Sequence, residues 1–141
     1  MSHISKIELE IKDLEALKQA CERLGFHFME NQKRYIWYGK WISQEPLPEG
    51  ITEEQLGHCT HAIHVPAATF EIGVVKKNNK YILLWDSWIG GGLQKYIGKD
   101  AGILKQAYAV ESVKRSAKQK GYRMIEKQMR NNKIRLSLCM S

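Results

Sequence analysis

The chain has 141 residues, a length that fits one domain over residues 1–141 and can bury a core without cross-links. Hydrophobic residues make up 43% and charged residues 26%, and no apolar run approaches the roughly 18 residues of a membrane span. Apolar and charged residues alternate at the N-terminus, where a signal peptide would carry a continuous apolar core. We therefore expect a cytoplasmic protein that does not enter a membrane and whose three cysteines are reduced.

The first elements predicted along the chain form a strand-helix-strand-strand (βαββ) unit over about residues 3–41. Apolar and charged side chains alternate over residues 5–11, the period of a half-buried strand. Asp13 is placed to cap a helix whose apolar residues recur at helical spacing, and Gly25 supplies a left-handed stop. The residues from 26 to 41 then read as two further strands.

A second unit of the same kind is predicted over about residues 80–141. Its first strand is followed by a glycine-bearing loop, a helix over residues 101–121 and a hairpin that turns at the asparagine pair 131–132. A connecting strand over residues 69–76 precedes this unit and joins it through the asparagine pair 78–79. Asparagine tolerates the positive φ that two-residue hairpin turns require.

The two units predict an α+β fold: a mainly antiparallel sheet with two helices on one face, built from two βαββ-like units. The helix exits support the duplication, because Gly25-Phe26 in the first unit is echoed by Gly121-Tyr122 in the second. The second face of such a sheet needs a cover, polar residues or a partner. A homodimer formed through that face is one way to cover it.

The net charge of +7 is concentrated in the C-terminal half of the chain. Residues 1–70 contain 7 Lys+Arg and 10 Asp+Glu, whereas residues 71–141 contain 15 and 5. This asymmetry predicts a basic surface suited to nucleic acid or an acidic protein, with a merely solvated basic surface as the alternative. The residues that would form the surface are Lys114, Arg115, Lys118, Arg123, Lys127, Arg130 and Arg135.

The stretch HCTHAIH, residues 58–64, contains three of the five histidines and one of the three cysteines. Cys59, His61 and His64 are candidate ligands for zinc or iron, because such sites need three or four converging nitrogen or sulfur ligands. In a strand, however, His58 and His64 point to one face while Cys59 and His61 point to the other. A metal site in a turning segment and a strand rich in surface histidines therefore both stay open.

The glycine-bearing loop before the second helix is a candidate site for an anionic ligand or nucleotide, because glycines leave backbone amides accessible. The loop does not match a Walker A sequence: five residues separate Gly92 from Gly98, and Lys99 is followed by Asp100. Glycines that serve tight turns are the alternative. The candidate binding residues are Gly90, Gly91, Gly92, Lys95 and Lys99.

Catalytic residues are not assigned from the sequence. Cys59 beside His58 and His61 is the sole arrangement that resembles a Cys-His pair, and adjacency in sequence is not the geometry of a catalytic triad. A non-enzymatic protein is favoured, and enzymatic activity stays open.

Four stretches together resemble a known family. They are MSHISKIELEIKDLEALKQACERLG, FEIGVV with a two-residue turn to KYILLWD, QAYAVESVKRSAKQKGY, and KIRLSL. In this order they resemble the bacterial and plastid family named domain of unknown function 1257, or hypothetical chloroplast open reading frame 35. The resemblance covers nearly the whole chain and implies a small single-domain α+β protein with an AAA-type ATPase as partner. Compared with shorter plastid-like members, residues 42–57 read as an insertion.

These expectations lead to one functional hypothesis and one alternative. The hypothesis is a non-enzymatic accessory or adaptor domain that binds a protein or nucleic acid through its sheet face and basic C-terminal half. The alternative is a protein that binds a metal or a small anionic ligand through the HCTHAIH stretch and the glycine-bearing loop.

Overall fold

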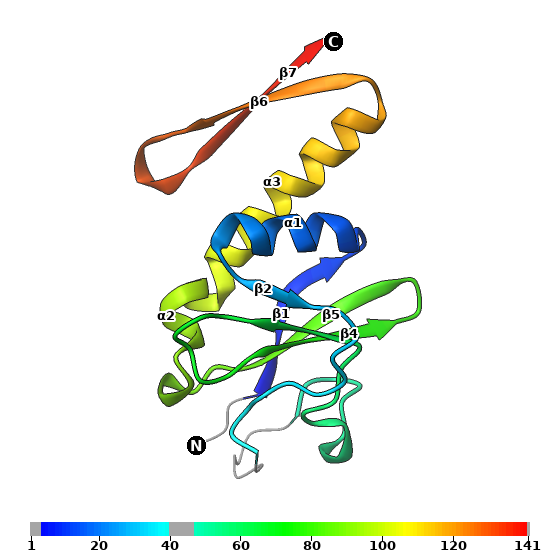
Figure 1. Ribbon diagram of the computed structural model, residues 1–141, viewed down its shortest axis with the longest axis vertical. Helices are drawn as coiled ribbons and strands as arrows, with labels where there is room; N and C mark the ends of the chain where they lie inside the picture. The colour runs from blue at the N-terminus through cyan, green and yellow to red at the C-terminus, as the bar shows by residue number, and fades with distance from the viewer. Residues whose placement is uncertain (1–3, 40–46, 141) are drawn as a thin grey trace.

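The computed structural model describes residues 4–39 and 47–140, and it has the α+β fold that the sequence predicts. Every pair of neighbouring strands in the main sheet is antiparallel, in the order β1-β5-β4-β3-β2 (Figure 1). These strands are β1 (Ile4–Ile11), β2 (His27–Met29), β3 (His61–His64), β4 (Ile72–Lys77) and β5 (Lys80–Asp86). The other elements are α1 (Leu14–Leu24), α2 (Leu93–Ile97), α3 (Gly102–Gln119), β6 (Tyr122–Gln128), β7 (Ile134–Met140), and 3-10 turns at Glu53–Gln55, Ile89–Gly91, Lys99–Ala101 and Arg130–Asn132.

Helix α1 begins and ends where the sequence predicts. Asp13 caps it with a side-chain oxygen that accepts from the N–H of Ala16 at 3.1 Å, and Gly25 ends it in the left-handed conformation with φ of 78°. Leu17 and Cys21 of this helix are fully buried in the core. Burial raises the pKa of the Cys21 thiol to about 12, which marks this cysteine as structural.

Helices α1 and α3 lie on the same face of the main sheet and cover one hydrophobic core (Figure 1). The buried hydroxyl of Tyr108 on α3 accepts hydrogen bonds from the N–H groups of Lys12 and Asp13 at 3.1 and 3.2 Å. Helix α3 is thereby tied to the start of α1. The largest fully buried side chains of this core are Ile11, Leu17, Ile63, Ile72, Leu83, Leu93, Ile97 and Leu104.

The second face of the main sheet is covered by the chain itself. Tyr35, Ile51 and Leu56 are buried against it and form a second hydrophobic cluster with side chains of the sheet. The expected insertion at residues 42–57 thus supplies part of the cover, although residues 42–46 lie outside the described part of the chain. The area under this cover is filled by the chain itself, so of the cover, polar residues or partner that the sequence left open for this face, a cover is found there.

Residues 33–39 were predicted as part of a strand, but they cross the second face without joining the sheet. Among the described residues of this segment, Arg34 alone pairs, in an isolated bridge to His58. Tyr35 packs over Gly73 of β4, where a Cβ would overlap its ring. The alternation of apolar residues here arises from packing on a sheet rather than pairing within it, because both neighbours of β4 are already in place.

The C-terminal hairpin forms a second sheet of two strands, β6 and β7, instead of extending the main one. It lies on the far side of the helices from the main sheet (Figure 1). The physical reason is the length of α3, whose 18 residues span roughly 27 Å and carry the chain away from the strands. The two predicted units therefore do not form one platform, and the second alone has its strand, helix and hairpin, because residues 33–39 add no strand to the first.

The two asparagine turns differ from each other. The pair 78–79 makes the predicted tight turn, because Lys77 and Lys80 on either side of it are direct partners. The pair 131–132 lies within a longer turn in which the N–H of Met129 donates to the carbonyl oxygen of Lys133 at 2.7 Å.

In the described ranges, the helices lack the length and apolar composition needed to cross a membrane.

Candidate functional site

The HCTHAIH stretch does not bring its three candidate ligands together. His61 is buried on the helix-covered face, and its Nδ1 accepts from the N–H of Asn31 at 2.9 Å. Cys59 packs on the opposite face, where its Sγ donates to the carbonyl oxygen of Gln32 at 3.2 Å and burial raises its pKa to about 11. In residues 4–39 and 47–140, no group of three or more His, Cys, Asp or Glu is arranged to hold a metal ion.

The glycines of the predicted ligand loop are required by packing. A Cβ at Gly91 would overlap the Phe70 ring, and one at Gly90 would come within 2.6 Å of Trp88. The carbonyl oxygen of Gly91 accepts from the N–H groups of Thr69 and Phe70 at 2.9 and 3.0 Å. Gly92, with φ of 79°, precedes the short helix α2, and the exposed Lys95 and Lys99 follow.

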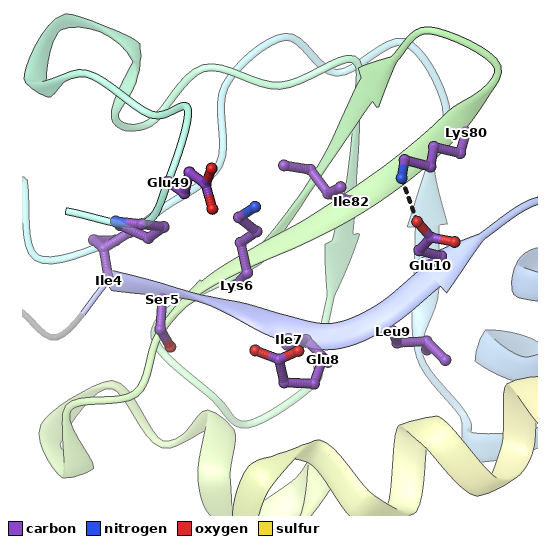
Figure 2. Close-up of a pocket in the computed structure, with 11 residues that line it drawn as sticks. Ile4, Ser5, Lys6, Ile7, Glu8, Leu9, Glu10, Glu49, Lys80 and Ile82 are labelled. Carbon is purple, nitrogen blue, oxygen red and sulfur yellow. Dashed lines mark hydrogen bonds and ion pairs between the residues drawn. The ribbon is translucent and has the colours of Figure 1, made fainter.

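A groove of about 590 Å³ runs along the edge strand β1, between β5 and residues 48–49. Figure 2 shows Lys80 and Glu10 pointing toward each other from the neighbouring strands β5 and β1, where they form an ion pair that lowers the pKa of Glu10. Two lysines and three glutamates line the groove, so its charges largely offset one another. It has no excess positive charge with which to attract a phosphate.

The C-terminal hairpin, in contrast, carries an uncompensated positive face. Arg123, Lys127 and Arg135 are exposed on one side of it, with the exposed Ile125 and Ser137 between them. Strand register places Lys127 directly opposite Arg135, so two like charges are neighbours on one surface. We call these five residues the basic hairpin face. Like charges in such pairs lower stability unless an anion lies close to them.

The positive charge continues around the basic hairpin face. Arg130 and Lys133 are exposed in the turn, and Lys118 is exposed in the last turn of α3. Residues 112–141 contain nine Lys+Arg and one acidic residue, Glu126. Across the described residues, no carboxylate lies within 4.0 Å of the cationic groups of Lys118, Arg123, Lys127, Arg130, Lys133 or Arg135.

Two of the predicted cations hold the fold together instead. Arg115 donates from Nε to Oδ2 of Asp13 at 2.8 Å, which ties α3 to the cap of α1. The ammonium of Lys114 lies 3.5 Å from Glu126 on β6 and 3.9 Å from Glu111. These two side chains are therefore less available to a ligand than the cations of the hairpin.

Sequence reasoning missed two parts of this site. Lys133 was not proposed, although it belongs to the same acid-free run after Glu126. The role of Glu126 in joining the hairpin to the helices was also missed. The sequence signal that could have revealed it is that Glu126 is the one acidic residue among the nine Lys+Arg of residues 112–141. Arg23 on α1 donates to it from Nη1 at 2.7 Å, and this hydrogen bond lowers the pKa of Glu126.

Comparison with protein-family models, curated proteins and solved structures gives no match for this chain.

Proposed function

We propose that this protein is a non-enzymatic nucleic-acid-binding domain that binds the phosphate backbone of duplex DNA through the basic hairpin face. The observation that carries the proposal is the pair Lys127 and Arg135, two exposed cations directly opposite each other without a carboxylate neighbour in the described residues. A phosphate between them would remove the repulsion that the folded hairpin otherwise bears. Each lysine or arginine that neutralises a phosphate also gains affinity by releasing counterions.

The shape of the hairpin supports a duplex partner. The major groove of B-form DNA admits a two-stranded β-ribbon, and β6 and β7 form such a ribbon at one end of the molecule (Figure 1). The turn at Arg130 and Lys133 extends the positive charge beyond the strands, as contact with successive phosphates requires. Because arginine and lysine contacts to phosphate carry no sequence information, we expect binding that depends weakly on base sequence.

An acidic protein is a weaker fit to the same surface. Stable protein interfaces have an apolar centre that is enriched in aromatic residues. Among the five residues of the basic hairpin face, Ile125 is the one apolar side chain, and it is 49% exposed. The charge is distributed along the ribbon and its turn rather than placed around an apolar centre.

The test is a fluorescence-anisotropy titration of a short labelled DNA duplex at salt concentrations from about 50 to 200 mM. The wild-type affinity should fall steeply with salt. The double variant Lys127→Gln/Arg135→Gln should bind more weakly and lower the slope of log affinity against log salt by about 1.8, since each phosphate contact contributes about 0.9.

The matched control is Lys95→Gln/Lys99→Gln, which removes the same charge from exposed residues in the glycine-bearing loop. It should leave the slope nearly unchanged. Equal effects of the two double variants would show a response to net charge and contradict a defined interface. Binding of polyglutamate with equal affinity would favour an acidic protein as the partner, and absence of DNA binding at low salt would refute the proposal.

A further inference from the structure

A pocket of about 560 Å³ lies where the end of α3 meets the start of β6 (Figure 1). Its volume falls within the roughly 300–1,000 Å³ that small-ligand sites occupy. Most of its lining comes from α3 and β6, and Gln19 of α1 completes it. The pocket is therefore built from three elements that also contact one another through Glu126.

The charges on the pocket lining leave an excess of two positive charges. Four cations line the pocket against one carboxylate, that of Glu111. Lys114 lies 3.9 Å from Glu111, and Arg115 donates to the carboxylate that caps α1 at 2.8 Å, so these two cations are offset. Within the described residues, no carboxylate lies within 4.0 Å of the other two, Lys118 and Arg123. A phosphate monoester carries about two negative charges at neutral pH and therefore matches this excess.

The pocket also has an apolar part. Side chains alternate along β6, so Tyr122 and Met124 share the strand face of Glu126, which contacts the helices. Both are half-buried, and both belong to the pocket lining. Tyrosine rings are among the surfaces on which proteins stack nucleic-acid bases. An inorganic phosphate would leave this apolar part uncovered, whereas the flat base of a nucleotide would cover it.

We propose that this pocket binds a nucleoside monophosphate, with Lys118 and Arg123 as the phosphate-binding cations and Tyr122 as the surface for the base. The same chemical group occurs in a free mononucleotide and at the 5′-phosphorylated end of a strand. The site goes beyond the proposed contact with duplex DNA, because Lys127 and Arg135 do not line the pocket.

The proposal is tested by calorimetric titration of the full, untagged chain with adenosine 5′-monophosphate (AMP) at low salt. We expect saturable binding of one nucleotide per chain. Adenosine, which lacks the phosphate, should bind at least about tenfold more weakly because it forms no charge-assisted hydrogen bonds with the two cations. Inorganic phosphate, which lacks the base, should bind about fivefold or more weakly than AMP because it loses the stacking contribution.

The role of the unpaired lysine is tested by Lys118→Gln. This variant should lower the affinity for AMP at least about tenfold, because it removes one of the two cations without a carboxylate neighbour. Lys120→Gln is the matched control, since Lys120 is an exposed lysine two positions away that does not line the pocket. The control should leave the affinity nearly unchanged.

The role of the aromatic ring is tested by Tyr122→Leu, which keeps an apolar side chain but removes the flat surface. The variant should bind AMP about fivefold or more weakly and should bind inorganic phosphate as the wild type does. Circular dichroism checks that it folds. A purely structural role for Tyr122 would instead weaken both ligands equally, and the result for Lys118→Gln does not depend on this variant.

Two further titrations separate this site from the DNA contact and identify the source of the phosphate. Lys127→Gln/Arg135→Gln should leave the affinity for AMP nearly unchanged, so the pocket and the DNA contact can each fail alone. A dinucleotide with a 5′-phosphate should bind more tightly than AMP if the ligand is a strand end, and more weakly if it is a free nucleotide.

Three results would overturn the proposal: a wild-type chain that does not bind AMP, equal affinities in Lys118→Gln and Lys120→Gln, or AMP that binds no more tightly than inorganic phosphate. Tighter binding of O-phosphotyrosine than of AMP would assign the pocket to a phosphorylated protein and would also contradict it.

Discussion

Glu126 of β6 and Arg23 of α1 form an ion pair that holds the C-terminal hairpin to the helices. Nη1 of Arg23 donates to Oε1 of Glu126 at 2.7 Å, although the two residues are 103 positions apart. Lys114 of α3 lies 3.5 Å from the same oxygen, so one carboxylate contacts both helices. Through these two contacts Glu126 helps to hold the basic hairpin face in its position relative to the helices.

Replacing Glu126 by glutamine should loosen the hairpin from the helices. The pair with Arg23 is doubly hydrogen-bonded and about three-quarters buried, so a loss of about 1 kcal/mol in the free energy of unfolding is expected. Hydrogen exchange should accelerate in β6 and β7 more than in α1. The matched control is Glu54→Gln, an exposed glutamate in a 3-10 turn, which should change neither quantity. Equal exchange rates in wild type and Glu126→Gln would contradict the anchoring role.

The stabilisation from the ion pair between Glu126 and Arg23 should be lost in acid. Arg23 holds the pKa of Glu126 below its ordinary value of 4.5, so the ionised carboxylate stabilises the folded state above that pH. This contribution is lost as the pH falls through the lowered pKa. The difference in unfolding free energy between wild type and Glu126→Gln, measured by urea denaturation, should be constant from pH 5 to 7 and shrink below about pH 4. A difference that grows on acidification has the wrong sign for this account.

The glycine-bearing loop should respond to substitution as a packing element. Gly91→Ala places a methyl group against the Phe70 ring and should destabilise the protein by about 1–3 kcal/mol. Gly102→Ala is the comparison, since nothing lies within 4 Å of its Cβ position and its φ of −59° suits any residue. It should be neutral or stabilise by up to about 1 kcal/mol. Thermal unfolding measures both changes. A Gly91→Ala protein as stable as wild type would show that packing against Phe70 does not require a glycine at this position.

The cysteine beside the histidines should behave as an unreactive thiol. Burial raises the pKa of Cys59 to about 11, so the thiolate that a nucleophile requires is scarce at neutral pH. Mass spectrometry after iodoacetamide treatment at pH 7.5 should show Cys59 and the fully buried Cys21 unmodified in the native protein. Both should react in urea. Rapid alkylation of native Cys59 would instead revive the Cys-His pair as a catalytic candidate.

The parts of the fold that depend on local signals were predictable from the sequence. Asp13 and Gly25 bound α1 through contacts within one helical turn, and the turn at residues 78–79 follows from its asparagines. The segment containing Tyr35 was wrong as a strand, because alternation cannot tell packing on a sheet from pairing within it. The prediction that the hairpin joins the main sheet was also wrong, because the position of the hairpin depends on the length and direction of α3.

The candidate site was predictable in charge but not in geometry. The acid-poor C-terminal run identified Arg123, Lys127 and Arg135 as a basic surface. The ion pair between Arg115 and Asp13, which makes Arg115 less available to a ligand, could not be predicted, because the two residues are 102 positions apart. Membership of the family named domain of unknown function 1257 stays a prediction.

The most direct test of the central claim is an amide chemical-shift titration of ¹⁵N-labelled protein with a short DNA duplex at low salt. The account predicts that shifts concentrate in β6, β7 and the turn between them, with the largest changes near Lys127 and Arg135, and that added salt reverses them. Shifts that concentrate in the glycine-bearing loop or along the β1 groove, or spectra that do not change, would contradict it.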